Sequence, residues 1–165
     1  MSGVSVTIDD RRVRDALNDM RSRVRNLRPA MDRIGATLAD RVRLGFHDGK
    51  DPWGQRWQPL RPATVSRRRQ GSDKPLRDTG RLMNSISHRA TRHSVTIGTD
   101  VEYAATHQFG ARKGQFGRTR KGSPIPWGNI PARRFMPIDD RGARLPDEWI
   151  DDIGMTLRQH IEVES

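Results

Sequence analysis

The triplet Asp78-Thr79-Gly80 is the short motif in this chain that could carry catalytic chemistry. In aspartic proteases, paired Asp-Thr-Gly loops place two carboxylates about one water molecule, and each loop follows a buried apolar strand. Here the lead-in, residues 73–77, is charged and interrupted by proline; only residues 95–98 resemble the apolar stretch that backs such a site. A short helix whose N-cap is Asp78 or Thr79 explains the triplet better, because Leu82 and Ile86 follow at helical spacing.

No other set of residues has the spacing of a reaction centre. The absence of cysteine excludes disulfides, thiolate metal sites and a cysteine nucleophile. The five histidines do not cluster, and the glycine-rich segment 110–122 matches no phosphate-binding motif. We therefore expect a protein that is not an enzyme and has no catalytic, metal or cofactor-binding residues.

Composition predicts a small core and an unusual distribution of charge. The chain has 165 residues, 33% apolar and 31% charged, which we interpret as one domain spanning 1–165 with extended loops at 47–76 and 111–129. The net charge is +11, yet residues 135–165 carry three basic and eight acidic groups. A basic middle with an acidic tail suits nucleic acid, or contacts between subunits of one ring. Without a signal peptide or membrane span, we expect a soluble intracellular protein.

Hydrophobic periodicity predicts an α+β fold with two N-terminal helices, a small and mainly antiparallel sheet, a C-terminal helix and long extended loops. A short strand at 5–8 precedes the helices, which we expect to pack on each other or across the sheet. Their apolar stripes are Val13, Ala16, Leu17, Met20, Val24 and Leu27, then Met31, Ile34, Leu38, Val42 and Phe46. A hairpin follows at 85–90 and 93–99, and then a helical turn from Tyr103.

Two further elements complete the predicted fold. Residues 130–137 look like a short strand fenced by prolines at a sheet edge. A helix begins near Asp147, with an acidic first turn that suits the helix dipole. Its apolar side is expected to hold Trp149, Ile150, Ile153, Leu157 and Ile161.

The two long loops are rich in basic residues. Trp53 and Trp57 stand in the first loop, and we interpret them as anchors that pin it to the fold, with base stacking on single-stranded nucleic acid as the alternative. The candidate groups for contacts with DNA or between subunits are Arg67, Arg68, Arg69, Arg112, Lys113, Arg118, Arg120 and Lys121.

Four motifs in a fixed order carry a family resemblance from about Phe46 to Ile138. They read Pro-x-Gly-x-x-Trp, Leu-x-x-Thr-Gly-x-Leu, Tyr-Ala-x-x-His-Gln-x-Gly and Pro-x-Arg-x-Phe. The chain thereby resembles the phage virion morphogenesis family of tail completion proteins, the Mu G-like and P2 S-like group. The matching residues are Pro52, Gly54, Trp57, Leu76, Thr79, Gly80, Leu82, Tyr103, Ala104, His107, Gln108, Gly110, Pro131, Arg133 and Phe135.

The resemblance implies a structural protein of the virion neck or tail end, assembled in the host cytoplasm. Such α+β subunits form rings that complete the tail and join it to the DNA-filled head. The implied partners are further copies of the chain (a hexamer favoured, a dodecamer the alternative), tail tube or sheath proteins and neck or connector proteins. DNA could pass through the lumen, and no membrane or cofactor is involved. The rival interpretation from charge alone is a basic nucleic-acid-binding module.

Overall fold

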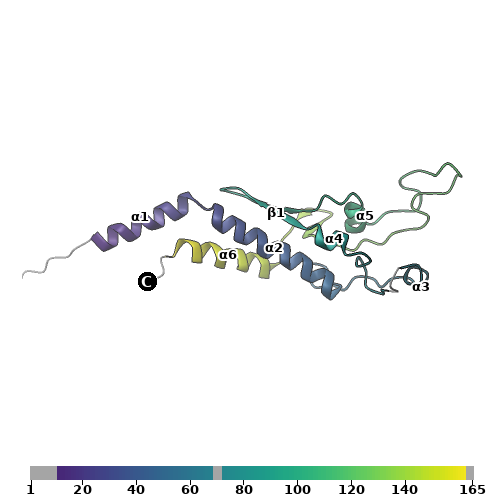
Figure 1. The fold of residues 1–165 in the computed structure, drawn as a ribbon, viewed down its shortest axis with the longest axis horizontal. Helices are drawn as coiled ribbons and strands as arrows, with labels where there is room; N and C mark the ends of the chain where they lie inside the picture. The colour runs from purple at the N-terminus through teal and green to yellow at the C-terminus, as the bar shows by residue number, and fades with distance from the viewer. Residues whose placement is uncertain (1–10, 69–71, 163–165) are drawn as a thin grey trace, which may run out of the picture.

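The computed structural model describes residues 11–68 and 72–162, and helix α2 (Arg28–Asp48) lies at the centre of the fold (Figure 1). Its seven buried residues, from Ala30 to Phe46, form a stripe at helical spacing. Pro29 stands in its first turn, where a missing amide hydrogen costs nothing. Gly49 ends the helix in the left-handed conformation, and its amide donates to the carbonyl of Gly45.

Helices α1 (Arg11–Arg25) and α6 (Asp147–Ile161) are the other long helices of the described chain. Helix α6 runs alongside α2, and Trp149 in its first turn is buried in the common core. Helix α1 extends away from the body and meets the C-terminal end of α6 (Figure 1). There the Arg23 guanidinium donates to the carbonyl of Glu162.

A β-hairpin covers another side of α2. Strands β1 (Ser87–Ala90) and β2 (Val95–Gly98) pair antiparallel, with Ser87 opposite Gly98. The hairpin approaches α2 closely at Gly35, where an added Cβ would clash with the His88 ring and lie 2.8 Å from Cγ2 of Val95. A second antiparallel pair is formed by β3 (Ile138–Asp139) and β4 (Gly142–Ala143).

Three short helices belong to the connecting segments: α3 (Pro62–Val65), α4 (Arg81–Asn84) and α5 (Ala104–Phe109). Loop 47–76 and the arm at 111–129 both lie at the end of the molecule away from α1 (Figure 1). The base of the arm is closed by an antiparallel bridge between Ala111 and Ile130. One end of the elongated molecule thus carries α1, and the other carries the loops.

The structure confirms the α+β class, the two N-terminal helices, the hairpin and the C-terminal helix. The predicted edge strand at 130–137 is wrong. This segment is extended but pairs with no strand, because Pro131 and Pro137 lack amide hydrogens and the amides of Phe135 and Met136 bond to a side chain instead.

Two further expectations about apolar faces are wrong. Ile150 is exposed, because the buried side of α6 is centred on Trp149 and Ile153. Helix α1 leaves Leu17, Met20 and Val24 exposed rather than packing them on α2, since it extends past the end of the body. The strand predicted at 5–8 lies outside the described residues.

Candidate functional site

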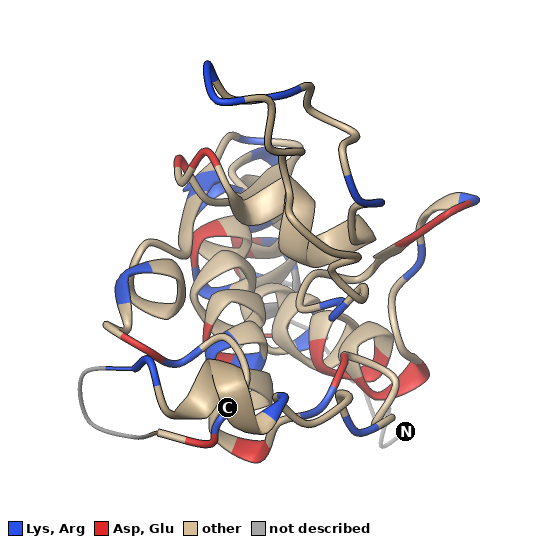
Figure 2. Cartoon of the chain, turned by 90° about the vertical axis from the view of Figure 1, so that its right-hand side faces the viewer, with Lys and Arg blue, Asp and Glu red and all other residues tan. Residues whose placement is uncertain are grey.

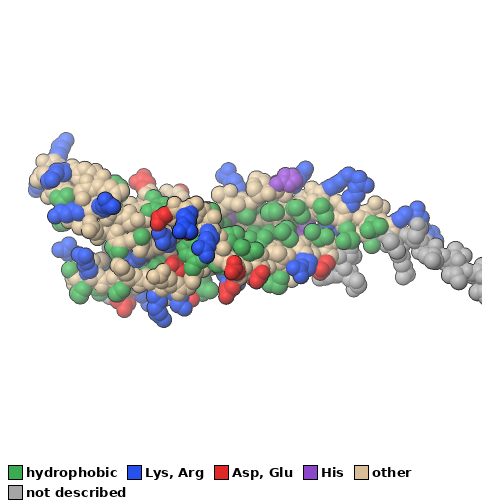
Figure 3. Space-filling view, turned by 180° about the vertical axis from the view of Figure 1, so that it is seen from behind, with side chains coloured by type: hydrophobic (Ala, Val, Ile, Leu, Met, Phe, Trp, Pro, Cys, Tyr) green, Lys and Arg blue, Asp and Glu red, His purple; other side chains and the backbone are tan. Residues whose placement is uncertain are grey.

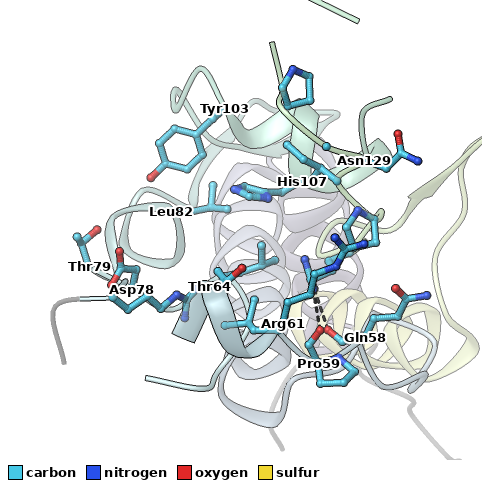
Figure 4. Close-up of a pocket in the computed structure, with 18 of the residues that line it drawn as sticks. Gln58, Pro59, Arg61, Thr64, Asp78, Thr79, Leu82, Tyr103, His107 and Asn129 are labelled. Atoms are coloured by element: carbon cyan, nitrogen blue, oxygen red, sulfur yellow. Dashed lines mark hydrogen bonds between the residues drawn. The ribbon is translucent and has the colours of Figure 1, made fainter. Parts of the chain in front are cut away.

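The second, third and fourth family-like motifs converge on one cleft, of about 1020 Å³, at the end of the molecule that carries the loops (Figure 4). Loop 47–76 forms one wall, α4 and α5 form another, and the base of the arm closes the third. The motif residues that line it are Leu76, Thr79, Gly80, Leu82, Tyr103, His107, Pro131 and Arg133. Segments far apart in sequence therefore meet at a single site.

Gln108 joins two of the motifs from a buried position in α5. Its Nε2 donates to the carbonyls of Met136 (3.1 Å) and Ile138 (2.8 Å). Its Oε1 accepts from the amides of Phe135 and Met136, both at 3.0 Å. The side-chain amide thus hydrogen-bonds the backbone of residues 135–138 as a neighbouring strand would in a sheet. Both polar atoms of this buried glutamine side chain have hydrogen-bond partners.

Gly110 ends α5 in a conformation that other residues rarely adopt, with φ 75° and ψ 179°. An added Cβ would lie 2.7 Å from the carbonyl oxygen of Ile130 and 2.9 Å from the amide nitrogen of Ala132. The glycine therefore lets the fourth motif pass directly over the end of α5. The contact is continued by the Arg133 amide, which donates to the carbonyl of His107 at 2.7 Å.

Arg133 fastens loop 47–76 to the rest of the cleft. Its buried side chain donates from Nε to the carbonyl of Gln58 (3.0 Å) and from Nη2 to the carbonyl of Pro59 (3.2 Å), the bonds dashed in Figure 4. A planar guanidinium can hold two adjacent carbonyls at once, which an ammonium cannot do with the same geometry. The third residue of Pro-x-Arg-x-Phe therefore has a structural task.

Trp57 is the anchor that its position predicts. Its indole Nε1 donates to the carbonyl of Arg134 at 2.9 Å, and its ring packs edge-on against Phe46 with centroids 5.6 Å apart. Phe135 packs on the other side of Phe46 at 5.4 Å. Trp53 is only half-buried, and its Nε1 is buried with no hydrogen-bond partner within ranges 11–68 and 72–162. The first and fourth motifs thus meet in the core through Trp57 and Phe135.

His107 sits in the cleft as a partly buried imidazole. Burial lowers the pKa of His107 below its ordinary value of 6.5, and the nearby cations Arg133 and Arg68 lower the pKa further. The Tyr103 ring lies edge-on to it with centroids 5.6 Å apart. Nδ1 of His107 is buried and lacks a hydrogen-bond partner among the described residues.

The triplet Asp78-Thr79-Gly80 lies at the rim of the cleft (Figure 4). Asp78 is the sole acid among the described residues that line the cleft, so the second carboxylate of an aspartic protease has no candidate there. The N-cap of α4 is Gly80, at φ 77°, rather than Asp78 or Thr79. Thr79 still caps locally, because its Oγ1 accepts from the amide of Arg81 at 3.3 Å.

The basic candidates separate into two groups. The Arg68 guanidinium lines the cleft and donates to backbone carbonyls of its own loop, including that of Lys74 at 2.6 Å. Arg67 is exposed beside it, and Arg69 lies outside the described residues. The exposed cations of the arm stand apart from the cleft, and Figure 2 shows this end of the molecule edged with Lys and Arg. They are Arg112, Lys113, Arg118, Arg120 and Lys121.

Sequence reasoning missed the wall that loop 47–76 gives to the cleft. Arg61 and Arg68 line it together with Arg81 and Arg133, so four arginines share the cleft with one acidic residue, Asp78. The sequence predicts Arg68 as a basic contact residue, but no spacing rule places Arg61 or Arg68 in a cleft, because they reach it through the irregular path of the loop. The fourth motif offered the one usable signal that the loop lines the cleft, since Arg133 donates to the carbonyls of Gln58 and Pro59, just before Arg61.

This arrangement positions segments of the chain relative to one another. Across the described ranges, 11–68 and 72–162, no three His, Cys, Asp or Glu side chains group as a metal site requires. Nδ1 of His107 has no hydrogen-bond partner in the described chain, so no nucleophile is bonded to that nitrogen. The motif residues hold the loop, α5 and the base of the arm together at one end.

Comparison with known proteins gives the class of the chain. Residues 8–160 match the phage virion morphogenesis family, and the chain belongs to that family. It is 37% identical over 108 residues to Mu-like prophage FluMu G protein 2 of Haemophilus influenzae. That match covers 66% of this chain and 64% of the relative, so the chain spans just under two thirds of the relative's length. No solved structure matches the chain. Among the described helices, none has the length and hydropathy needed to cross a membrane.

Proposed function

We propose that this protein is a non-catalytic subunit of a ring at the neck or tail end of a phage virion, where it completes the tail. It acts as the tail terminator or as a head–tail joining subunit. The observation that carries the proposal is the use of the family-like motifs. Gln108, Gly110 and Arg133 fix the loop and the arm at one end of the subunit, as an assembly surface requires.

Six copies form the ring in this proposal, with twelve as the alternative if the subunit sits on the head side of the neck. The arm at 111–129 and loop 47–76 contact a neighbouring copy or an adjoining ring. The partners above and below are tail tube or sheath proteins and neck or connector proteins. Assembly takes place in the host cytoplasm and the product is part of the virion.

A test of this proposal uses tails that were assembled without the protein. Purified full-length protein should bind such tails and restore their joining to DNA-filled heads, and native mass spectrometry should give its stoichiometry. A variant that shortens the arm at 115–125 should fold but join poorly, because the arm reaches the neighbour. A protein that stays monomeric with and without tails, and restores nothing, would contradict the proposal.

The charge of the arm favours a second candidate function, contact with DNA. Residues 111–129 contain five basic residues and no acid, and their cations are exposed. Each phosphate contact contributes about 0.9 to the slope of log affinity against log salt. We expect the triple variant Arg118→Ala, Arg120→Ala, Lys121→Ala to lower that slope by about 3.

The matched control removes the same charge elsewhere. Arg141→Ala, Arg144→Ala, Arg158→Ala loses three exposed cations outside the arm. Fluorescence anisotropy with duplex DNA between low and physiological salt gives both slopes. If the arm variant and the control change the slope equally, the arm is not the contact and its charge serves protein partners.

A further inference from the structure

Helix α1 presents an apolar stripe that its own chain does not cover. Leu17, Met20 and Val24 recur at steps of three and four residues, so they lie on one face of the helix. Their exposed fractions are 59%, 36% and 50%. The helix is joined to the body near its C-terminal end, where His160 bonds to the carbonyls of Arg23 and Asn26.

A helix of this length needs a partner for that face. Helix α1 has 15 residues, and isolated helices shorter than about 12–15 residues are marginal in water even with good helix formers. In proteins most helix stability comes from burial of the amphipathic face. Burial of Leu, Met and Val side chains stabilises a folded chain, and α1 leaves most of this stabilisation unused in the monomer.

The body offers a matching apolar surface, seen in Figure 3 as a band of hydrophobic side chains that continues from α1 along the molecule. On α6, Ile150, Ile153 and Leu157 recur at steps of three and four, with Ile150 exposed and the other two partly buried at the edge of the core. Met31 of α2 is partly buried against the same core. We name Met31, Ile150, Ile153 and Leu157 the body strip.

Charge around the two surfaces is complementary. Helix α1 contains six arginines and two aspartates, and Arg21 and Arg25 are exposed. The start of α6 carries Asp147 and Asp151, both exposed and adjacent in the helix to Ile150. The basic helix and the acidic edge of the body strip attract each other.

This pairing cannot form within one chain. Helix α1 meets its own α6 at the C-terminal end of α6, through Arg23 and Glu162. Asp147 begins that helix, so about 20 Å of helix, at 1.5 Å per residue, separates the acids from the contact. Helix α1 also points away from the body (Figure 1). The partner of its stripe is therefore on another molecule.

We propose that α1 of one copy packs its apolar stripe on the body strip of the neighbouring copy, with Arg21 and Arg25 beside Asp147 and Asp151. The inference rests on the proposed ring and gives it a specific contact. Two different surfaces meet, so the contact is heterologous, and repetition around an axis closes a ring.

The first test measures assembly of the full-length chain by native mass spectrometry and sedimentation velocity. Leu17→Glu, Val24→Glu places two charges in the stripe, and the assembled fraction should fall at least tenfold. Leu44→Glu, Met155→Glu is the matched control, because these residues are 51% and 53% exposed and lie on other faces of α2 and α6. Circular dichroism checks that both variants keep the folded body.

The second test locates the contact by cross-linking, which is clean because the chain has no cysteine. Val24→Cys and Ile150→Cys are made in separate chains, one of them enlarged by a tag, and mixed with a short thiol cross-linker. We expect a cross-linked pair of mixed size, and a much lower yield when Leu44→Cys, at an equally exposed position, replaces Ile150→Cys.

The outcomes separate the two proposals. A ring that persists in the stripe variant, or cross-linking no better than the control, overturns the α1 contact and leaves the ring standing. A wild-type chain that stays monomeric alone and on tails overturns both.

Discussion

The side-chain amide of Gln108 pairs with the backbone of Met136 as a strand neighbour would. Its Oε1 accepts from the Met136 amide at 3.0 Å, and its Nε2 donates to the Met136 carbonyl at 3.1 Å. The second bond of each atom, to the Phe135 amide and the Ile138 carbonyl, extends the pairing along the segment. One buried glutamine thereby replaces a strand and holds two motifs of the family together.

Replacing Gln108 with Leu should destabilise the fold strongly. The change removes the partner of the Phe135 and Met136 amides and of the Ile138 carbonyl. The Met136 carbonyl still accepts from the Ile138 amide at 2.7 Å. A buried unsatisfied group costs about 1–3 kcal/mol. We expect a loss of about 3–5 kcal/mol in the free energy of unfolding, since relaxation lets water reach some of these groups. Urea denaturation measures it, and the exposed Gln159→Leu should change little; equal losses at both sites would contradict the role of Gln108.

Gly110→Ala should destabilise more than Gly117→Ala. Both glycines have positive φ, 75° and 95°, so both substitutions strain the backbone by about 1–3 kcal/mol. Only at Gly110 does the new Cβ collide with backbone, 2.7 Å from the oxygen of Ile130, whereas nothing lies within 4 Å at Gly117. Thermal unfolding of the two variants should therefore differ by several degrees, and similar midpoints would argue against the close crossing at the end of α5.

His107 should make the protein less stable in mild acid. Its pKa is lowered in the fold, so below its ordinary value of 6.5 the unfolded chain takes up a proton that the folded chain resists. Stability is thus fully present above pH 6.5 and declines as the pH falls from there towards the folded pKa. Unfolding of His107→Gln at pH 8 and pH 5.5 should show a smaller decline than wild type. His93→Gln, in the exposed turn, should keep the wild-type decline.

Arg133→Met should release loop 47–76 while leaving the core in place. The variant keeps the length of the side chain but loses both bonds to the carbonyls of Gln58 and Pro59. Hydrogen exchange in residues 58–68 should become faster, because the loop opens more often. Arg134→Met removes only a half-exposed ion pair with Asp140 and should leave that exchange unchanged. No difference between the two variants would contradict the anchoring role.

The helices and strands that face the core of their own chain are predictable from the sequence, because each has a stripe of apolar residues on its buried face. The spacing of Ile34, Leu38, Val42 and Phe46 predicts a buried helix face, and the alternation through Val95 and Ile97 predicts the hairpin. Periodicity states that a face is apolar but not what covers it. The stripe of α1 therefore predicts the helix correctly but not what packs against it. The same spacing groups Ile150 with Trp149, although the core covers only the side of α6 that carries Trp149.

The motif residues at this end of the molecule are predictable from the sequence, and their geometry is not. The motifs name Gln108 and Arg133, but the side-chain hydrogen bonds of these two residues cross 27 to 75 residues of chain and leave no local pattern. The strand expected at 130–137 failed for the same reason, because Gln108 supplies from a helix the bonds that local alternation assigns to a sheet. Residue type predicts Asp78 or Thr79 as the N-cap of α4, while Gly80 takes that place with a positive φ.

Electron microscopy of this protein, carrying a visible tag and bound to tails assembled without it, decides whether the protein completes the tail. We expect tagged density at a single end of each tail, as a closed ring with six-fold symmetry, or twelve-fold if it sits on the head side. Density along the tube, or tails that carry none while the protein remains monomeric, would contradict a role in tail completion.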